Sequence, residues 1–162
     1  MPINLNRALR RAAGGALALL CLAQAAFAGD HGRMANVPLL PKYQQECAAC
    51  HLAYPSGLLP ASSWQRLMNN LPHHFGTDAS LDAATVQELS AWLDANAGTY
   101  RRVREAPPDD RITSSAWFVR KHDEVPAETW KRPAVKSAAN CAACHMHAEQ
   151  GVFNEHDVRI PR

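Results

Sequence analysis

The sequence has few long apolar runs and no strong excess of charge of either sign. Only one uncharged apolar run is present, residues 12–26, and it is shorter than the roughly 20 residues that a membrane-spanning helix needs. The 17 basic and 15 acidic residues nearly balance, so charge gives no indication of a nucleic-acid partner. No segment alternates apolar and polar residues as a half-buried strand does. These absences predict an all-α protein that does not insert into a membrane once the first run is removed.

That first run belongs to a segment with the features of an export signal. Three arginines among the first 11 residues precede it, and it ends in AFAGD, where Ala26 and Ala28 fit the small-residue rule for cleavage. A membrane anchor is the alternative interpretation. We predict a signal peptide over residues 1–28, a single domain over residues 29–162, and export to the periplasm.

Outside this segment the sequence has no cysteine except in two identical CAACH pentads. The pattern C-x-x-C-H is the attachment sequence of c-type haem, because its two thiols add to the two vinyl groups and the histidine that follows faces the iron. Two copies predict two haem c groups. The expected attachment residues are Cys47, Cys50, Cys141 and Cys144, and the expected first axial ligands are His51 and His145.

Three other uses of four cysteines compete with this interpretation. Two C-x-x-C knuckles can hold structural zinc, but zinc sites do not require a histidine directly after each knuckle. Disulfides are common in exported proteins. A thioredoxin-like redox pair is expected beside a βαβ pattern, which the sequence lacks. Two identical pentads that use every remaining cysteine favour haem.

Apolar periodicity and turn residues predict short helices separated by long loops. The expected helices cover residues 43–51, 62–71, 80–98, 113–122 and 137–147, with a surface-packed coil over 148–162. Ser62 or Ser63 can cap the second helix, and Ser80 or Asp82 the third. The fold class is therefore small and all-α, packed around two covalently bound haems. Because the haems would fill much of the core, we expect the apoprotein to be poorly ordered.

The second axial ligand of each iron decides between an open and a closed site. Six further histidines are available: His31, His73, His74, His122, His147 and His156. Three of them lie near the predicted new N-terminus, beside a pentad or in the charged tail, which leaves His73, His74 and His122 as better candidates. Methionines are weaker rivals, because Met146 adjoins its own pentad and Met68 fits the apolar face of a helix.

Four longer pieces of the sequence carry a family resemblance. They are CAACHLAYPSGLLPASSWQRLM, LPHHFGTDASLD, RITSSAWFVRKHDEVP and NCAACHMHAEQGVFNEHDV. In this order, across most of residues 43–160, they resemble the small dihaem cytochrome c family of bacterial exported proteins. The resemblance implies an electron carrier with two bis-histidine haems, and it implies His74 and His122 as the second axial ligands. The working hypothesis pairs His74 with the first pentad and His122 with the second; His73 stays an alternative to His74.

The sequence thus predicts one-electron transfer in the periplasm by a protein that is not an enzyme. At family level the expected partners are other redox proteins, a soluble haem protein or a membrane cytochrome b, met transiently. Basic residues could steer an acidic partner or form a solvated connector; they are Arg101, Arg102, Arg104, Arg120 and Lys121. The alternatives are a haem enzyme or gas-binding protein with one open or labile axial site, and a sensor or assembly module with structural haem.

Overall fold

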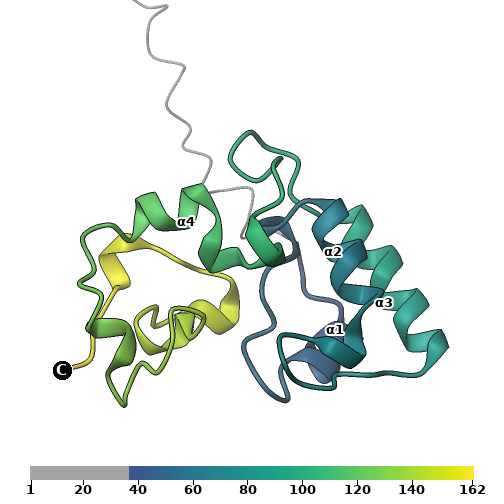
Figure 1. Ribbon diagram of the computed structural model, residues 1–162, viewed down its shortest axis with the longest axis horizontal. Coiled ribbons are helices and arrows are strands. Elements are labelled where there is room, and N and C mark those ends of the chain that lie inside the picture. Colours follow the sequence, from purple (N-terminus) through teal and green to yellow (C-terminus); the bar gives the residue numbers. More distant parts are fainter. Residues whose placement is uncertain (1–36) are drawn as a thin grey trace, which may run out of the picture. The chain divides into compact units, whose positions relative to one another are not determined.

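Three α-helices gather together in the first half of the described chain. The computed structural model describes residues 37–162, and the predicted signal segment, residues 1–28, lies outside them. The three helices are α1 (Pro41–Cys47), α2 (Ala61–Met68) and α3 (Ala83–Ala95) (Figure 1). Both α1 and α2 pack against α3. This arrangement follows from short amphipathic helices that bury their apolar faces against one another.

The apolar core lies between these helices. Leu89 and Leu93 are one turn apart on α3 and are buried, and Trp64 and Met68 have the same spacing on α2. The Trp64 indole donates a hydrogen bond from Nε1 to the carbonyl of Ser56 at 2.7 Å, so the buried ring is satisfied. The core is therefore built by residues that come before the second pentad.

The last part of the chain, residues 104–162, buries few apolar side chains. Its one α-helix is α4 (Ala116–Lys121), and most of the remaining chain forms short 3-10 turns and loops. Phe118, Val135 and Ala148 are its buried apolar residues. The C-terminal segment, yellow in Figure 1, returns to α4, where Lys121 Nζ forms an ion pair with Glu155 Oε1 at 2.6 Å.

Helix positions agree with the prediction, but several boundaries and one helix do not. Only Cys47, the first residue of the first pentad, lies in α1, and the other four residues follow the helix. The helix predicted over 137–147 is wrong, because only Cys141–Ala143 is helical and it is a 3-10 turn. Side chains there bond to nearby backbone groups in place of a helical ladder: Ser137 Oγ accepts from the Ala139 amide, and Asn140 Nδ2 donates to the carbonyl of Val135.

The predicted cap of the second helix is also wrong. The N-cap residue of α2 is Pro60, whose fixed backbone starts the helix without a side-chain bond, so neither Ser62 nor Ser63 caps it. The prediction for the third helix is confirmed, because Asp82 accepts a hydrogen bond from the amide of Thr85. Within residues 37–162 there is no β-strand, which confirms the all-α class, and no helix there is long and apolar enough to cross a bilayer.

Ser115 caps the N-terminus of α4, the helix that is followed directly by the predicted haem ligand His122. Ser115 is buried and accepts a hydrogen bond from the amide of Phe118, while its hydroxyl donates to the carbonyl of Ile112 at 2.7 Å. We expect Ser115→Ala to lower the free energy of unfolding by about 1 kcal/mol, because the first turn of α4 loses its cap. Denaturant unfolding followed by circular dichroism measures this change.

The matched control is Ser62→Ala. Ser62 lies inside α2, is exposed and is not the cap. Alanine has the higher helix propensity, so the control should leave stability unchanged or raise it slightly. Equal destabilisation by the two substitutions would contradict a specific capping role for Ser115.

Candidate haem sites

The first pentad begins at the end of α1. Cys47 is half-buried against the helical core, whereas Cys50 and His51 follow it in a turn and are exposed. His51 Nδ1 lies 2.7 Å from the carbonyl oxygen of Leu52. A carbonyl can only accept, so Nδ1 carries the proton and donates. This leaves His51 Nε2 with a free lone pair, the form in which histidine binds a metal.

A second histidine faces this pentad from another segment. The ring centroids of His51 and His74 are 6.0 Å apart and their planes differ by 21°. An iron between two imidazoles, with metal–nitrogen bonds of about 2.0 Å, separates the ring centres by about 6 Å. His51 and His74 therefore have the spacing of two axial ligands of one iron.

A tight turn presents His74. The amide of Thr77 donates to the carbonyl of His74 at 3.0 Å, and the residues between them, Phe75 and Gly76, have φ angles of 49° and 94°. Glycine adopts such angles without strain, while phenylalanine does so at a cost. The Phe75 ring meets the His74 ring edge to face at 4.9 Å, and the Arg111 guanidinium lies 4.3 Å from the centre of Phe75. These contacts fix the direction of His74.

The second pentad is held by the C-terminal segment. After the 3-10 turn Cys141–Ala143, His145 forms an isolated β-bridge with Val158. The amide of Arg159 donates to the carbonyl of Cys144 at 2.8 Å. The tail predicted as a surface coil is thus paired with the pentad and fixes its backbone.

His122 faces the second pentad from the end of α4. Its Nδ1 donates to the carbonyl of Phe118 at 2.9 Å, and its ring stacks on the Phe118 ring with centroids 4.0 Å apart. The ring centroids of His122 and His145 are 6.1 Å apart, and their planes differ by 80°. The spacing repeats that of the first site, while the two rings are nearly perpendicular.

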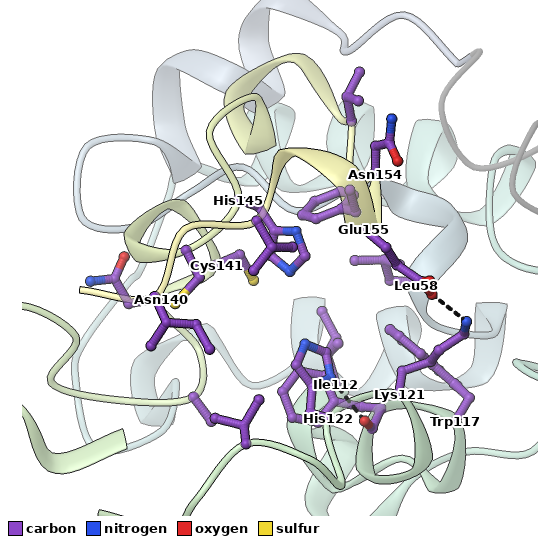
Figure 2. Close-up of a pocket in the computed structure, with 18 of the residues that line it drawn as sticks. Leu58, Ile112, Trp117, Lys121, His122, Asn140, Cys141, His145, Asn154 and Glu155 are labelled. Atoms are coloured by element: carbon purple, nitrogen blue, oxygen red, sulfur yellow. Dashed lines mark hydrogen bonds and ion pairs between the residues drawn. The ribbon is translucent and has the colours of Figure 1, made fainter. Parts of the chain in front are cut away.

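A cavity of about 530 Å³ separates this second pair. Figure 2 shows His122 and His145 pointing into it from opposite sides, with Cys141 beside His145. Its volume lies in the range of roughly 300–1,000 Å³ that is typical of cofactor and ligand sites. The walls are largely apolar and include four aromatic side chains, Trp117, Phe118, Trp130 and Phe153. Such walls suit a flat apolar macrocycle and exclude water from it.

The electrostatics of the sites favour neutral imidazoles. Burial lowers the pKa of His74, and electrostatic repulsion between a protonated His74 and its neighbours His51 and Arg111 lowers it further. Burial also lowers the pKa of His145, with a smaller contribution from His122. The Nδ1 atoms of His74 and His145 are buried and have no hydrogen-bond partner within residues 37–162. A neutral ring is the protonation state that an axial ligand requires.

The competing uses of the cysteines receive no support from this geometry. All four cysteines of the described region are free thiols, and no three metal-ligating side chains cluster there. Burial raises the pKa of Cys47 and of Cys141 to about 11. A thioredoxin-like site needs a thiol of lowered pKa, so these cysteines lack its reactivity. Two thiols and a facing histidine pair at each pentad fit two covalently bound haems.

The remaining candidate ligands have other surroundings, and one of them, His31, lies outside residues 37–162. His73 is exposed, and its Nδ1 lies 3.0 Å from Asn70 Oδ1, so it is hydrogen-bonded beside the helix end. His147 is exposed. His156 is also exposed, and it lines the cavity between His122 and His145. Met68 is buried in the helical core, as predicted from its spacing. Of these side chains, His156 alone lines a cavity that contains a histidine pair.

Sequence patterns did not reveal the side chains that support the predicted ligands. The Tyr54 ring lies nearly parallel to the His51 ring, with centroids 5.0 Å apart. Phe153 meets His145 edge to face at 5.4 Å. Only 7% of the residues in the chain are aromatic, and both of these lie within ten residues of a pentad. This proximity was the sequence feature that could have indicated their role.

Comparisons with known proteins agree with this geometry. The sequence profile of the family described as dihaem cytochrome c matches residues 43–153. A crystal structure of a dihaem cytochrome type c from Shewanella baltica OS155 is 39% identical, with a TM-score of 0.67, covering 77% of this chain and 95% of that one. A structure of DHC purified from Rhodobacter sphaeroides is 47% identical, with a TM-score of 0.63, covering 72% of this chain and 99% of that one.

A second structure of a dihaem cytochrome c from Rhodobacter sphaeroides is 46% identical, with a TM-score of 0.64, covering 72% of this chain and 98% of that one. The comparison with curated protein sequences gave no match. The family match spans both pentads and both facing histidines, and the structural matches span nearly the whole length of their own chains. The chain therefore belongs to the dihaem cytochrome c family and carries two haem c groups.

Proposed function

We propose that this protein is a periplasmic carrier of single electrons in which both haem irons have two histidine ligands. The observation that carries the proposal is the pair of facing histidines at each pentad, with ring centroids 6.0 Å apart at the first and 6.1 Å at the second. Haem c supplies a one-electron ferric–ferrous couple when bound. Two histidines per iron leave no axial position for a substrate.

The residues of each site then have separate tasks. The thiols of Cys47 and Cys50, and of Cys141 and Cys144, tether the macrocycles. The carbonyls of Leu52 and Phe118 hold one ring of each histidine pair in place through its Nδ1. Rings held in this way need not move when the charge at the site changes, so the reorganisation that opposes electron transfer stays small.

The two sites differ in their access to solvent. At the first, His51 and Cys50 are exposed and the Phe75 side chain is 43% exposed. At the second, the histidines line an apolar cavity. We propose that redox partners, a soluble haem protein or a membrane cytochrome b, dock transiently at the first site. A haem close to the surface lies closer to the partner's cofactor, and electron transfer is faster over a shorter distance. Exposed Arg101 and Arg104 could steer an acidic partner to the protein.

Electron paramagnetic resonance of the oxidised protein tests the ligands. The ring planes differ by 21° at the first site and by 80° at the second. Two iron d orbitals can overlap with the π systems of the axial imidazoles. Parallel imidazole planes interact with the same one of these orbitals, so the two orbitals differ strongly in energy. Perpendicular planes interact with one orbital each, so the energy difference is small. We therefore expect two low-spin signals of equal intensity, one rhombic and one with a large principal g value, and no high-spin signal.

Carbon monoxide provides the opposing test. With four histidines in place, the reduced protein should show no immediate spectral shift on addition of the gas. A rapid shift affecting one haem would contradict the proposal and favour the enzyme or gas-binding alternative. A high-spin signal in the oxidised protein would lead to the same conclusion.

A further inference from the structure

One side chain contacts both haem segments. The Tyr54 ring lies against the ring of His51, with centroids 5.0 Å apart and planes 21° apart. Its hydroxyl donates a hydrogen bond of 2.7 Å to the carbonyl of Ala139, a residue 85 positions further along the chain. Ala139 lies two positions before Cys141, the first residue of the second pentad. Tyr54 thus reaches from a predicted axial ligand of the first site to the attachment segment of the second.

The carbonyl of Ala139 is shared by two donors. Besides the Tyr54 hydroxyl, it accepts a hydrogen bond of 3.1 Å from the amide of Cys141. A third contact, from the Cys141 thiol at 3.7 Å, is lost once that sulfur is bound to haem, so two donors remain. A carbonyl oxygen has two lone pairs, so both bonds can form together. The Tyr54 hydroxyl and the first cysteine of the second pentad are therefore linked through one oxygen atom.

The backbone of Tyr54 is itself anchored in the helical core. The hydroxyl of Tyr43, a residue only 2% exposed, donates to the carbonyl of Tyr54 at 2.8 Å. A phenol has an ordinary pKa of about 10, so the Tyr54 hydroxyl keeps its proton at neutral pH and remains a donor. The ring is held at one end by the core and at the other by Ala139.

The two pentads also face a common space. A cavity of about 630 Å³ is lined by Ala48 to Tyr54 on one side and by Ala139, Asn140 and Ala142 on the other. The hydrogen bond from the Tyr54 hydroxyl to the carbonyl of Ala139 joins two of the segments that line this space.

We propose that Tyr54 is a positioning residue that ties the first haem site to the second: its ring fixes the plane of His51 and its hydroxyl fixes the attachment segment at Ala139. The proposal rests on the haem sites proposed above, and it assigns to Tyr54 no change of its own oxidation state. Through this contact the separation of the two haems, and hence the rate of exchange between them, depends on one phenol group.

The test of the hydroxyl compares Tyr54→Phe with wild type in the haem-loaded protein. Hydrogen–deuterium exchange of the amides at 139–141 should become about fivefold faster, the change in opening expected for the loss of one neutral hydrogen bond. The matched control is Tyr100→Phe, because the Tyr100 hydroxyl also donates to a backbone carbonyl, that of Gly57 at 2.9 Å, and Gly57 belongs to neither pentad. Exchange at 139–141 that is equal in all three proteins would overturn the link.

The test of the ring compares Tyr54→Leu with Tyr54→Phe by electron paramagnetic resonance. Phenylalanine keeps the stack on His51, so the rhombic signal should stay in place. Leucine removes it, and that signal should shift or broaden while the other remains. An unshifted rhombic signal in Tyr54→Leu would overturn the role of the ring. Immediate carbon monoxide binding by wild type would instead refute the proposed function, and the exchange test would remain decisive for the hydroxyl.

Discussion

A protein in which Cys141 and Cys144 are both replaced by serine should contain one haem and lose the order of its second half. The cavity of about 530 Å³ would then lack its covalent occupant. Its largely apolar walls would face water in place of the macrocycle, and this part of the chain would lose the apolar burial that holds it together. Phe118, Val135 and Ala148 are too few buried apolar residues to replace that burial.

Two measurements check this result. Intact mass should show one haem in place of two, and amide exchange should become fast over residues 116–160 while α3 stays protected. The helical core explains the protection, because Leu89 and Leu93 pack with residues that all precede the second pentad. Two haems in the variant would contradict the attachment, and slow exchange over 116–160 would contradict the role of haem as the core of that region.

The corresponding first-pentad variant is the control for position. Serine at Cys47 and Cys50 removes the other attachment, but Cys47 adjoins a helical core that is already filled by protein side chains. We expect that variant to lose one haem as well and to keep α2 and α3 protected from exchange. The contrast separates the loss of a haem from the loss of a core.

Covalent haem chemistry is local in sequence, which is why the attachment residues could be predicted. Two thiols and a histidine must be nearly adjacent to serve one macrocycle, so the pentads were visible without a structure. The buried faces of α2 and α3 could also be predicted from the sequence. Their buried apolar residues, Trp64 and Met68 on α2 and Leu89 and Leu93 on α3, are spaced by one helical turn. The helix predicted over 137–147 failed because serine and asparagine side chains there compete for the backbone bonds.

The second axial ligand of each iron lies far from its pentad in the sequence, so the sequence could only reduce the number of candidate histidines. Composition and position left His73, His74 and His122, and the family resemblance selected two of these. The structure brings His74 and His122 within about 6 Å of the pentad histidines, and their ligation stays a prediction that this spacing supports. The pairing of the tail with His145 through Val158 could not be read from the sequence, since nothing local marks a contact between such short segments.

The choice between adjacent histidines gives the sharpest test of the first site. The turn at Phe75 and Gly76 directs His74 toward His51, whereas His73 is hydrogen-bonded to Asn70. We expect His74→Ala to abolish the rhombic low-spin signal, produce a high-spin signal and allow the reduced protein to bind carbon monoxide. His73→Ala, a matched control one residue away, should retain both low-spin signals. The spectra of the two oxidised variants decide the assignment.

Added imidazole distinguishes a lost ligand from a damaged fold. Because His51 is exposed and Phe75 is 43% exposed, a small base from solvent can reach the first site. Imidazole should therefore return the His74→Ala protein to a low-spin spectrum and suppress its binding of carbon monoxide. A misfolded variant would not recover in this way. Loss of the rhombic signal in His73→Ala, or its persistence in His74→Ala, would show that the neighbouring histidine is the ligand after all.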